Sequence, residues 1–342
     1  MSRHVVVIGG GVAGMECAGR LGMMGHRVTL IEKDAKTGGH AALWYQLFPD
    51  RRPAREVIDY LNESGTAGDV TVFTGTVVKS VTRGGNCLAV ETNGPGSLNA
   101  DAVIIATGFD LFDAGKKEEY GHGIYENVIT SAELEEMFHN GKVLTVSGKS
   151  PERVGIIHCV GSRDEKVGNF HCSKVCCVTA VKQAIEIREL MPDTQVFCFY
   201  MDMRMFGPYY EELYRESQEK WNVSYVRGRV SEASETIGGR LVIKVEDTLA
   251  GRPLRMELDM LVLMTGMEPS AAGSQLARNS GLIAGANGFL AGNDHHYGTN
   301  ESPLKGVFYA GSCVAPMNIT DSLSHARAAV LGVSEYLSKL SQ

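Results

Sequence analysis

The 342-residue sequence has neither an excess of positive charge nor a long apolar run. Its 33 Lys and Arg are outnumbered by 40 Asp and Glu, which gives a formal net charge of −7. Because phosphate binding depends on a basic surface, we expect no nucleic-acid partner. No apolar run approaches the ~18 residues that a membrane span needs, and no charged leader precedes the first expected strand at about His4. These absences predict a cytoplasmic protein without direct membrane insertion.

Two patterns of redox and nucleotide-binding proteins are also missing. None of the eight cysteines forms a C-x-x-C pair, and no ferredoxin-type C-x-x-C-x-x-C run occurs. The sequence therefore predicts neither a redox dithiol nor the paired ligands of a zinc knuckle, and structural disulfides are not expected in a reducing compartment. After the strand expected at 153–159, a charged segment replaces a second G-x-G-x-x-G turn, so we expect no phosphate cradle there.

A complete G-x-G-x-x-G turn is present near the N-terminus. Residues 4–32 read as strand, glycine turn, helix and second strand, which is the dinucleotide-binding arrangement. Gly9 permits the tight turn, Gly11 lets the backbone approach a pyrophosphate, and Gly14 lets helix and strand touch. Glu32, at the end of the second strand, is placed to accept hydrogen bonds from ribose hydroxyls. The alternative is a glycine turn without a ligand.

The domain that begins with this turn is completed only near the C-terminus. One apolar strand ends at residues 106–108, and another ends at Gly311 before a final amphipathic helix. We therefore expect a module of residues 119–269 inserted into a discontinuous domain of residues 1–118 and 270–342. This layout resembles the thioredoxin-reductase-like superfamily, in which an NAD(P)H domain splits an FAD domain.

The resemblance implies an α/β fold of two Rossmann-like dinucleotide-binding domains of the thioredoxin-reductase/glutathione-reductase type, the second inserted in the first. It also implies FAD as a cofactor. One departure is Gly311-Ser312, where the superfamily has Gly-Asp, although serine can still hydrogen-bond. The positions that match the superfamily's flavin-binding positions are Gly9, Gly11, Ala13, Gly14, Glu32, Lys33, Val77, Ala106, Thr107, Gly108, Gly311, Ser312 and Thr320.

Half of the cysteines lie in one window, where the second glycine loop would stand. Cys159 ends the expected strand, and Cys172 and the adjacent pair Cys176 and Cys177 lead into a helix. Four thiolates gathered at one strand end suit an iron–sulfur cluster. Two alternatives remain open: buried structural thiols, since free cysteine is often buried, and a zinc site, although zinc ligands usually form two separated knuckles.

The segments around these cysteines are similar to the A subunit of heterodisulfide reductase, HdrA, and the similarity covers essentially the whole chain. They read C-V-G-S-R-D-E, H-C-S-K-V-C-C, A-V-K-Q-A, M-D-M-R-M-F-G-P-Y-Y-E-E and T-G-M-E-P. The resemblance implies a 4Fe–4S cluster held by Cys159, Cys172, Cys176 and Cys177 beside FAD. Because the 342 residues contain neither the N-terminal cluster-binding extension nor the C-terminal ferredoxin inserts of the methanogen form, we expect a compact form. This compact form resembles the HdrA-like subunit of the sulfur-oxidising sHdr complex.

The function implied by this resemblance is electron transfer between flavin and partner iron–sulfur subunits in a cytoplasmic complex of sulfur oxidation. The implied partners are HdrB-like and HdrC-like subunits, a lipoate-binding protein and a second copy of the chain in a homodimer. One alternative is the A subunit of a quinone-interacting membrane-bound oxidoreductase, Qmo. Others are an NAD(P)H-dependent disulfide reductase, which needs the missing loop and C-x-x-C, and a flavin-retaining scaffold without redox turnover.

Lys182 is the expected catalytic residue. It lies five residues after Cys177 on the expected helix, and a cation there can stabilise a reduced flavin or the cluster. The alternative is a solvated lysine. Arg163 and Asp164 are expected to form a local ion pair that orders the cysteine loop.

Further expectations concern local structure. A helix over 131–141 capped by Ser131 is expected before a strand over 142–148. Three other cysteines lie in helix or strand patterns and are expected in the core: Cys17, Cys87 and Cys198. Cys313 is expected to pack rather than approach the flavin.

Overall fold

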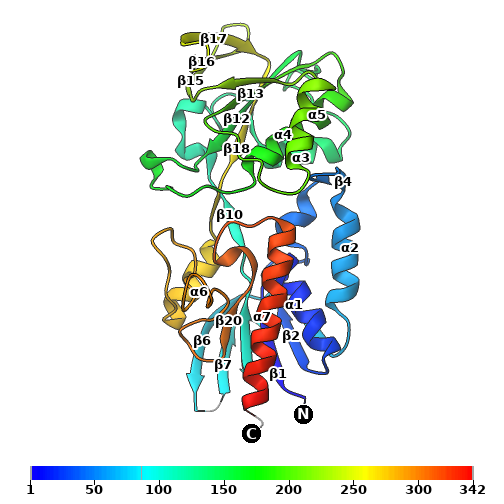
Figure 1. Ribbon diagram of the computed structural model, residues 1–342, viewed down its shortest axis with the longest axis vertical. Helices are drawn as coiled ribbons and strands as arrows, with labels where there is room; N and C mark the ends of the chain where they lie inside the picture. The colour runs from blue at the N-terminus through cyan, green and yellow to red at the C-terminus, as the bar shows by residue number, and fades with distance from the viewer. Residues whose placement is uncertain (1, 86, 341–342) are drawn as a thin grey trace. The chain divides into compact units, whose positions relative to one another are not determined.

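The computed structural model describes residues 2–85 and 87–340, and the chain divides into two compact units (Figure 1). Unit 1 comprises Met1–Ala42, Ala54–Asp110 and Glu268–Gln342, and unit 2 comprises Leu43–Pro53 and Leu111–Met267. The sequence predicted an inserted module of residues 119–269. Unit 2 also includes the segment 43–53 and the residues that directly follow Asp110.

Unit 1 is built on a five-stranded parallel sheet in the order β20-β9-β1-β2-β5. Its strands are β1 (His4–Ile8), β2 (Arg27–Ile31), β5 (Val70–Phe73), β9 (Ala102–Ile105) and β20 (Val307–Tyr309). Because side chains alternate along a strand, Val5 and Val7 enter one core while Val6 and Ile8 enter another. The sheet is therefore covered on both faces.

Helices cover the first face of this sheet, and α1 and α7 pack against each other there (Figure 1). An antiparallel sheet of three strands and one helix cover the second face. The elements of the two covers are α1 (Val12–Met23), α2 (Ala54–Gly65), α7 (Ile319–Lys339), β6 (Val78–Gly84), β7 (Cys87–Thr92), β8 (Ser97–Ala100) and α6 (Ala271–Ser280).

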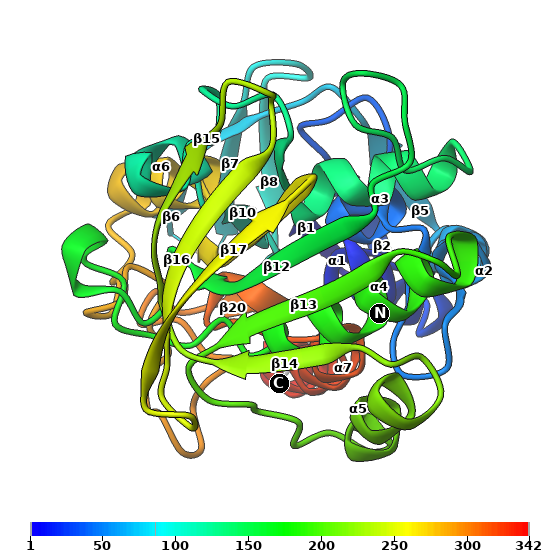
Figure 2. The ribbon, with the colours of Figure 1, turned by 90° about the horizontal axis from the view of Figure 1, so that it is seen from above.

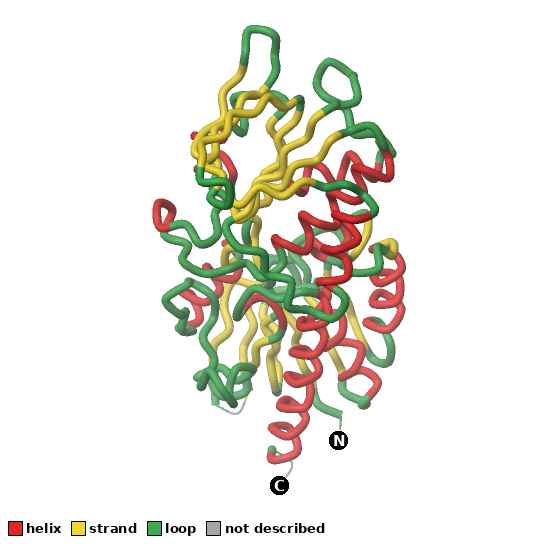
Figure 3. The backbone as a smooth tube through the Cα atoms, turned by 45° about the horizontal axis from the view of Figure 1, so that its top comes forward, coloured by secondary structure: helices red, strands yellow, loops and turns green. Residues whose placement is uncertain are grey.

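Unit 2 repeats this plan with a five-stranded parallel sheet in the order β11-β18-β12-β13-β14. Helices lie on one face and three antiparallel strands on the other (Figures 2 and 3). The parallel strands are β11 (Val128–Thr130), β12 (Arg153–Val160), β13 (Gln195–Tyr200), β14 (Ser224–Arg227) and β18 (Met260–Thr265). The covering elements are α3 (Ser131–His139), α4 (Cys176–Leu190), α5 (Tyr210–Glu219), β15 (Val230–Glu235), β16 (Leu241–Asp247) and β17 (Arg252–Leu258).

Short elements connect these layers. They are η1 (Gly39–Leu43), β3 (Gln46–Leu47), β4 (Arg52–Pro53), β10 (Phe109–Leu111), η2 (Ala114–Lys116), η3 (Glu118–Tyr120), η4 (Glu165–Val167), β19 (Met267–Pro269) and η5 (Gly311–Cys313). Within residues 2–85 and 87–340, no helix combines the length and the hydropathy that a membrane span requires.

Three local expectations are wrong. The strand over 142–148 is absent, because the amide of Thr145 donates to the Lys149 carbonyl at 2.9 Å and closes a turn. The cap of α3 is Thr130 rather than Ser131, with Glu133 completing a capping box. Cys87 is only partly buried, on β7, whereas Cys17 and Cys198 lie in the core as expected.

Candidate functional site

The turn between β1 and α1 is held by close backbone contacts on one side. The amide of Gly9 donates to the carbonyl of Ile31 at 2.7 Å. A Cβ at Gly9 would lie 2.3 Å from the Ala106 carbonyl oxygen, and one at Gly14 would lie 1.7 Å from the Gly9 carbonyl oxygen. A Cβ at Gly11 would meet nothing within 4 Å. Two glycines therefore permit packing, while the third borders open space.

The N-terminus of α1 opens onto that space. Gly11 is the N-cap residue, no side chain caps the helix, and no acidic residue lies in its first turn. The first backbone N–H groups of a helix have no acceptor within it, and with the helix dipole they favour an anion. The position fits the pyrophosphate of a dinucleotide.

Glu32 is held beside this turn at the end of β2. Its side chain is buried, and its two carboxylate oxygens accept from the amides of Gly10 at 2.6 Å and Asp34 at 2.8 Å. A carboxylate has further lone pairs for hydroxyl donors, so the expected contact with ribose stays a prediction. The sequence reasoning missed Gly10, whose amide links the glycine turn to Glu32.

Several of the other expected flavin-binding residues lie together at this turn. A Cβ at Gly311, whose φ is +70°, would lie 2.6 Å from the Cβ of Ala13. The amide of Gly311 donates a hydrogen bond to Nδ1 of His325 at 3.0 Å. The sequence reasoning missed this histidine. Ala106 lies against Gly9 and Gly14. The more peripheral expected residues differ in burial: Ser312 is buried, Thr107 and Gly108 are partly buried, and Lys33, Val77 and Thr320 are exposed.

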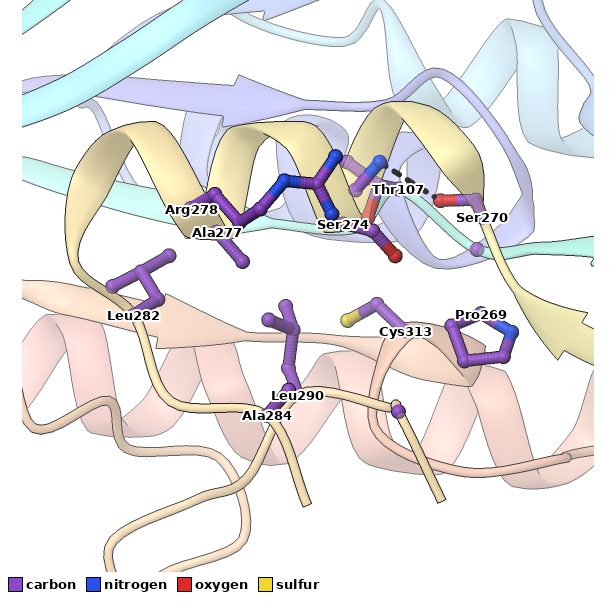
Figure 4. Close-up of a pocket in the computed structure, with 13 residues that line it drawn as sticks. Thr107, Pro269, Ser270, Ser274, Ala277, Arg278, Leu282, Ala284, Leu290 and Cys313 are labelled. Atoms are coloured by element: carbon purple, nitrogen blue, oxygen red, sulfur yellow. Dashed lines mark hydrogen bonds between the residues drawn. The ribbon is translucent and has the colours of Figure 1, made fainter. Parts of the chain in front are cut away.

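A cavity of about 240 Å³ lies beside Thr107 and Gly108 in unit 1 (Figure 4). Its lining is mostly apolar, and residues of α6 form one side. The thiol of Cys313 also lines it and donates to the carbonyls of Ile105 at 3.2 Å and Ala310 at 3.3 Å. Burial raises the pKa of Cys313 to about 12. Cys313 is therefore a buried thiol donor that packs in the core, as expected.

The segment between β12 and α4 is a loop over residues 161–175 that folds on itself. The hydroxyls of Ser162 and Ser173 hydrogen-bond to each other, and the Ser173 hydroxyl accepts from the amide of Met267 at 2.8 Å. A Cβ at Gly161 would lie 2.0 Å from the Phe112 ring. This glycine therefore serves packing inside unit 2, and the loop presents no glycine cradle for phosphate.

The four cysteines of this region gather at the C-terminal end of β12 and the start of α4. Cys159, Cys176 and Cys177 are buried, Cys172 is partly exposed, and all four thiols are free. Burial raises the pKa of Cys159 to about 12, with further contributions from Cys177 and Cys172. Burial also raises the pKa of Cys176 well above its ordinary value, and the other three thiols add to the shift. Each thiol is therefore within electrostatic range of others.

Basic side chains and an amide donor surround these thiols. Arg163 and Arg204 oppose the effect of burial on the pKa of Cys159 and Cys177. The amide of Lys174 donates to the sulfur of Cys172 at 3.3 Å. Positive charge and N–H donors both stabilise anionic sulfur. These groups offset part of the effect of burial, which nevertheless keeps the pKa of Cys159 and Cys177 above its ordinary value.

The donor set fits an iron–sulfur cluster in its chemistry, since it is all sulfur with nearby cations and an N–H donor. In the part of the chain that the structure describes, no three His, Cys, Asp or Glu side chains are grouped closely enough to hold a metal ion. Three non-glycine residues of the region have left-handed backbone: Cys159 (φ 59°), Arg163 (φ 53°) and Lys174 (φ 66°). Ligation would therefore draw the thiols together from an irregular loop.

The expected ion pair between Arg163 and Asp164 is wrong. Arg163 pairs with Asp202 at 2.6 Å. Asp164 is buried and pairs with Lys117 at 2.7 Å and with Arg229. Although burial acts in the opposite direction, the hydrogen bond from Lys117 keeps the pKa of Asp164 below its ordinary value. The two residues anchor the loop to separate parts of unit 2.

Lys182 is buried on α4, so the alternative of a solvated lysine is wrong. Its side chain is 2% exposed, and its ammonium lies 2.6 Å from a carboxylate oxygen of Glu135 and 3.2 Å from one of Glu186. It also donates to the carbonyl of Gln46 at 2.9 Å. Burial raises the pKa of Glu186 to about 8, although Lys182 acts in the opposite direction.

The segment 43–53 is held against this ion group. The amide of Tyr45 donates to Glu135 at 2.8 Å, and Arg51 pairs with Glu189 at 3.0 Å. The sequence reasoning missed Glu135 and Glu186. The i,i+4 spacing of Lys182 and Glu186 is a signal that could have found the second of these.

His158 is a further residue that the sequence reasoning missed. It is buried at the end of β12, directly before Cys159, and burial lowers its pKa to about 4. The ring therefore stays a neutral imidazole at neutral pH.

Comparison with solved structures confirms the predicted fold class. Thioredoxin reductase of T. acidophilum superposes with a TM-score of 0.69 at 20% sequence identity, over 99% of this chain and 100% of that chain. At this identity the likeness concerns the fold alone. Two Rossmann-like units of the thioredoxin-reductase type account for the parallel sheets of both units.

Sequence comparisons define the relatives. Residues 3–151 match the model of the pyridine nucleotide-disulphide oxidoreductase family. The chain is 31% identical to the iron-sulfur A subunit of the CoB–CoM heterodisulfide reductase of Methanocaldococcus jannaschii, over 98% of this chain and 64% of the relative. It is 41% identical to the A subunit of the H(2):CoB-CoM heterodisulfide,ferredoxin reductase of Methanothermobacter marburgensis, over 68% of this chain and 36% of the relative. The chain thus spans less than two thirds of the length of these relatives. The chain is similar in sequence to the heterodisulfide reductase A subunits, and its residues 3–151 match a pyridine nucleotide-disulphide oxidoreductase domain.

Proposed function

We propose that the chain is an electron-transfer subunit that binds FAD in unit 1 and a 4Fe–4S cluster in unit 2. The observation that carries this proposal is the different content of two equivalent turns. The turn from β1 to α1 has open space beside Gly11, whereas the region from the end of β12 to the start of α4 carries four free thiols, and Phe112 fills the space beside Gly161.

The residues proposed to hold FAD are those of the glycine turn and its surroundings. The amides at the start of α1 would bind the pyrophosphate, and Glu32 would accept from the ribose. FAD, when bound, accepts or delivers electrons singly or in pairs. The absence of a Cβ at Gly11 keeps the position of the pyrophosphate open.

Cys159, Cys172, Cys176 and Cys177 are the proposed cluster ligands. The word iron-sulfur in the name of the Methanocaldococcus jannaschii relative supports this assignment. Such a cluster carries electrons one at a time. The residues of the loop would hold it and shield it, since three of the four thiols are already buried.

Lys182 is proposed as the cation that stabilises the reduced redox centre. Its Nζ lies 2.6 Å from a carboxylate oxygen of Glu135. If the role is correct, Lys182→Met lowers the flavin midpoint by tens of millivolts, because about 30 mV corresponds to ~1.4 kcal/mol for a two-electron couple. Lys182→Arg, which keeps the charge, is the matched control.

The proposed setting is a cytoplasmic heterodisulfide reductase-like complex of sulfur oxidation, with HdrB-like and HdrC-like subunits, a lipoate-binding protein and a homodimeric arrangement of this chain. The relatives' names, as A subunits of heterodisulfide reductases, support a multi-subunit complex. Co-purification from the native source tests the partners: lipoate-binding proteins support this setting, and membrane quinone-reactive subunits support the Qmo alternative.

Anaerobic purification with cluster reconstitution tests the assignment of the cofactors. We expect one FAD and about four iron atoms per chain, and Cys176→Ala should lose iron while keeping FAD. Cys198→Ala is the matched control, because Cys198 is a buried cysteine of the same unit. Stoichiometric zinc, or no metal at all, would favour the scaffold alternative. Rapid bleaching of the flavin by NADH or NADPH would revive the NAD(P)H-dependent disulfide reductase.

A further inference from the structure

The buried imidazole of His158, directly before Cys159 in the chain, has no hydrogen-bond partner within the described residues. The side chain of His158 is 6% exposed, and within the described ranges 2–85 and 87–340 neither ring nitrogen has a hydrogen-bond partner. A neutral imidazole carries one N–H donor and one acceptor nitrogen. Buried polar groups in proteins are almost always satisfied, so this ring requires an explanation.

A ring contact shows on which face of the sheet His158 lies. Ile156 packs toward α4 and Ile157 toward the antiparallel strands, but the register of β12 shifts between Ile157 and Val160, so alternation alone does not place His158. Its ring contacts that of Tyr200 at a centroid distance of 6.4 Å, which places it on the α4 face. Tyr200 is two residues beyond Cys198, which shares the core of Ile156.

The same face holds the first turn of α4. Cys176 packs in the core of Ile156 and Cys198, and α4 contacts β12. In a parallel α/β unit the helix after a strand runs back along the sheet, so its N-terminus lies at the C-terminal end of that strand. His158 is near the end of β12, and Cys176 and Cys177 begin α4. His158 and the cysteine pair therefore share one face and one end of the sheet.

We propose that the imidazole N–H of His158 donates a hydrogen bond to a sulfur atom of the cluster held by the four cysteines, and thereby positions the cluster and raises its reduction potential. This inference rests on the proposed function. Cluster sulfurs accept hydrogen bonds, and such bonds favour the reduced, more negative state. One amide already donates to sulfur in this loop, from Lys174 to Cys172.

Potentiometric titration of the anaerobically reconstituted full chain tests the inference, with the reduced cluster followed by electron paramagnetic resonance. In His158→Leu, which fills the space without a donor, we expect a lower cluster midpoint at unchanged flavin midpoint. His158→Gln, which keeps a side-chain N–H, should shift the midpoint less. Cys198→Ala, a change in the same core, should leave it unchanged.

A second readout uses wild-type chain labelled with ¹⁵N-histidine. Pulsed resonance of the reduced cluster should show a weak coupling to one histidine nitrogen that is lost in labelled His158→Gln. This measurement also decides the matter if His158→Leu fails to fold. A wild-type midpoint in His158→Leu, equal shifts in both variants, or no histidine coupling in the wild type would overturn the inference. A wild-type chain without iron would instead refute the proposed function.

Discussion

The two units carry different residues at the same position of the same fold. In unit 1 the strand passes into its helix through consecutive glycines, one of which borders open space at Gly11. In unit 2 the strand passes into its helix through residues 161–175, where the Phe112 ring fills the space beside Gly161. A glycine pattern alone therefore does not define a nucleotide site. Whether a glycine turn can accept a phosphate also depends on whether the space beside the glycine is empty or filled by protein.

Gly11→Val is expected to have the largest effect on this comparison. The branched side chain would occupy the position proposed for the pyrophosphate, so purified protein should contain no FAD. Because nothing lies within 4 Å of that Cβ, the apo fold should be kept. Gly84→Val is the matched control, since its Cβ also meets open space in unit 1. Flavin at full stoichiometry in Gly11→Val would show that unit 1 does not bind the cofactor through this turn.

Gly14→Ala sharpens the distinction between packing glycines and open glycines. The new Cβ would lie 1.7 Å from the Gly9 carbonyl oxygen, and we expect a loss of about 4 kcal/mol or more in the free energy of unfolding. In the loop of unit 2, Gly168 has φ +75° but open space around its Cβ. Gly168→Ala should therefore cost only ~1–2 kcal/mol, for the left-handed backbone. Denaturant titration measures both, and equal losses would remove the distinction.

Lys182→Met tests whether the ion group of unit 2 is a structural element. The substitution leaves Glu135 and Glu186 buried without their cation, and breaking a buried pair in this way costs about 3–5 kcal/mol. Adding Glu135→Gln to Lys182→Met should restore part of the loss. Chemical denaturation followed by tryptophan fluorescence gives the values. A loss below ~1 kcal/mol in Lys182→Met would match an exposed pair instead.

Glu186→Gln is expected to have the smallest effect, on the pH dependence of stability. The pKa of Glu186 is raised from 4.5 to about 8 in the folded chain, so the folded state holds a proton there that the unfolded state releases. Its contribution to stability is fully present below the ordinary carboxyl pKa and is lost as the pH rises through about 8. Between pH 5.5 and 8.5 the free energy of unfolding of the variant should therefore fall by about 3 kcal/mol less than that of wild type. Glu189→Gln, on the same helix but partly exposed, should behave like wild type.

The sequence predicted the elements that carry strong hydrophobic patterns. The strand expected from about His4 forms as His4–Ile8, the strand expected at 153–159 forms as Arg153–Val160, and the fold class is confirmed. The expected strand at 142–148 has strand-like residues, and Val143 is buried, but Gly141 and Gly148 adopt φ of +65° and +76° and the segment turns. A strand needs a neighbour to pair with, and local composition does not report one.

The candidate site was predictable only where its signal was local. The glycine turn and the four cysteines are visible in the sequence because their spacing carries the chemistry. The partners of Lys182, Asp164 and segment 43–53 come from distant parts of the chain. The sequence could not predict the role of His158 either, because its burial and its lack of hydrogen-bond partners among the described residues are properties of the folded chain.

Anaerobic reductive titration of the wild-type chain tests the central claim most directly. A chain with flavin in unit 1 and a 4Fe–4S cluster in unit 2 should take up about three electrons, two into the flavin and one into the cluster. The last should appear as a paramagnetic signal of a reduced cluster, absent from Cys176→Ala. An uptake of only about two electrons, with no such signal in fully reconstituted protein, would contradict the account.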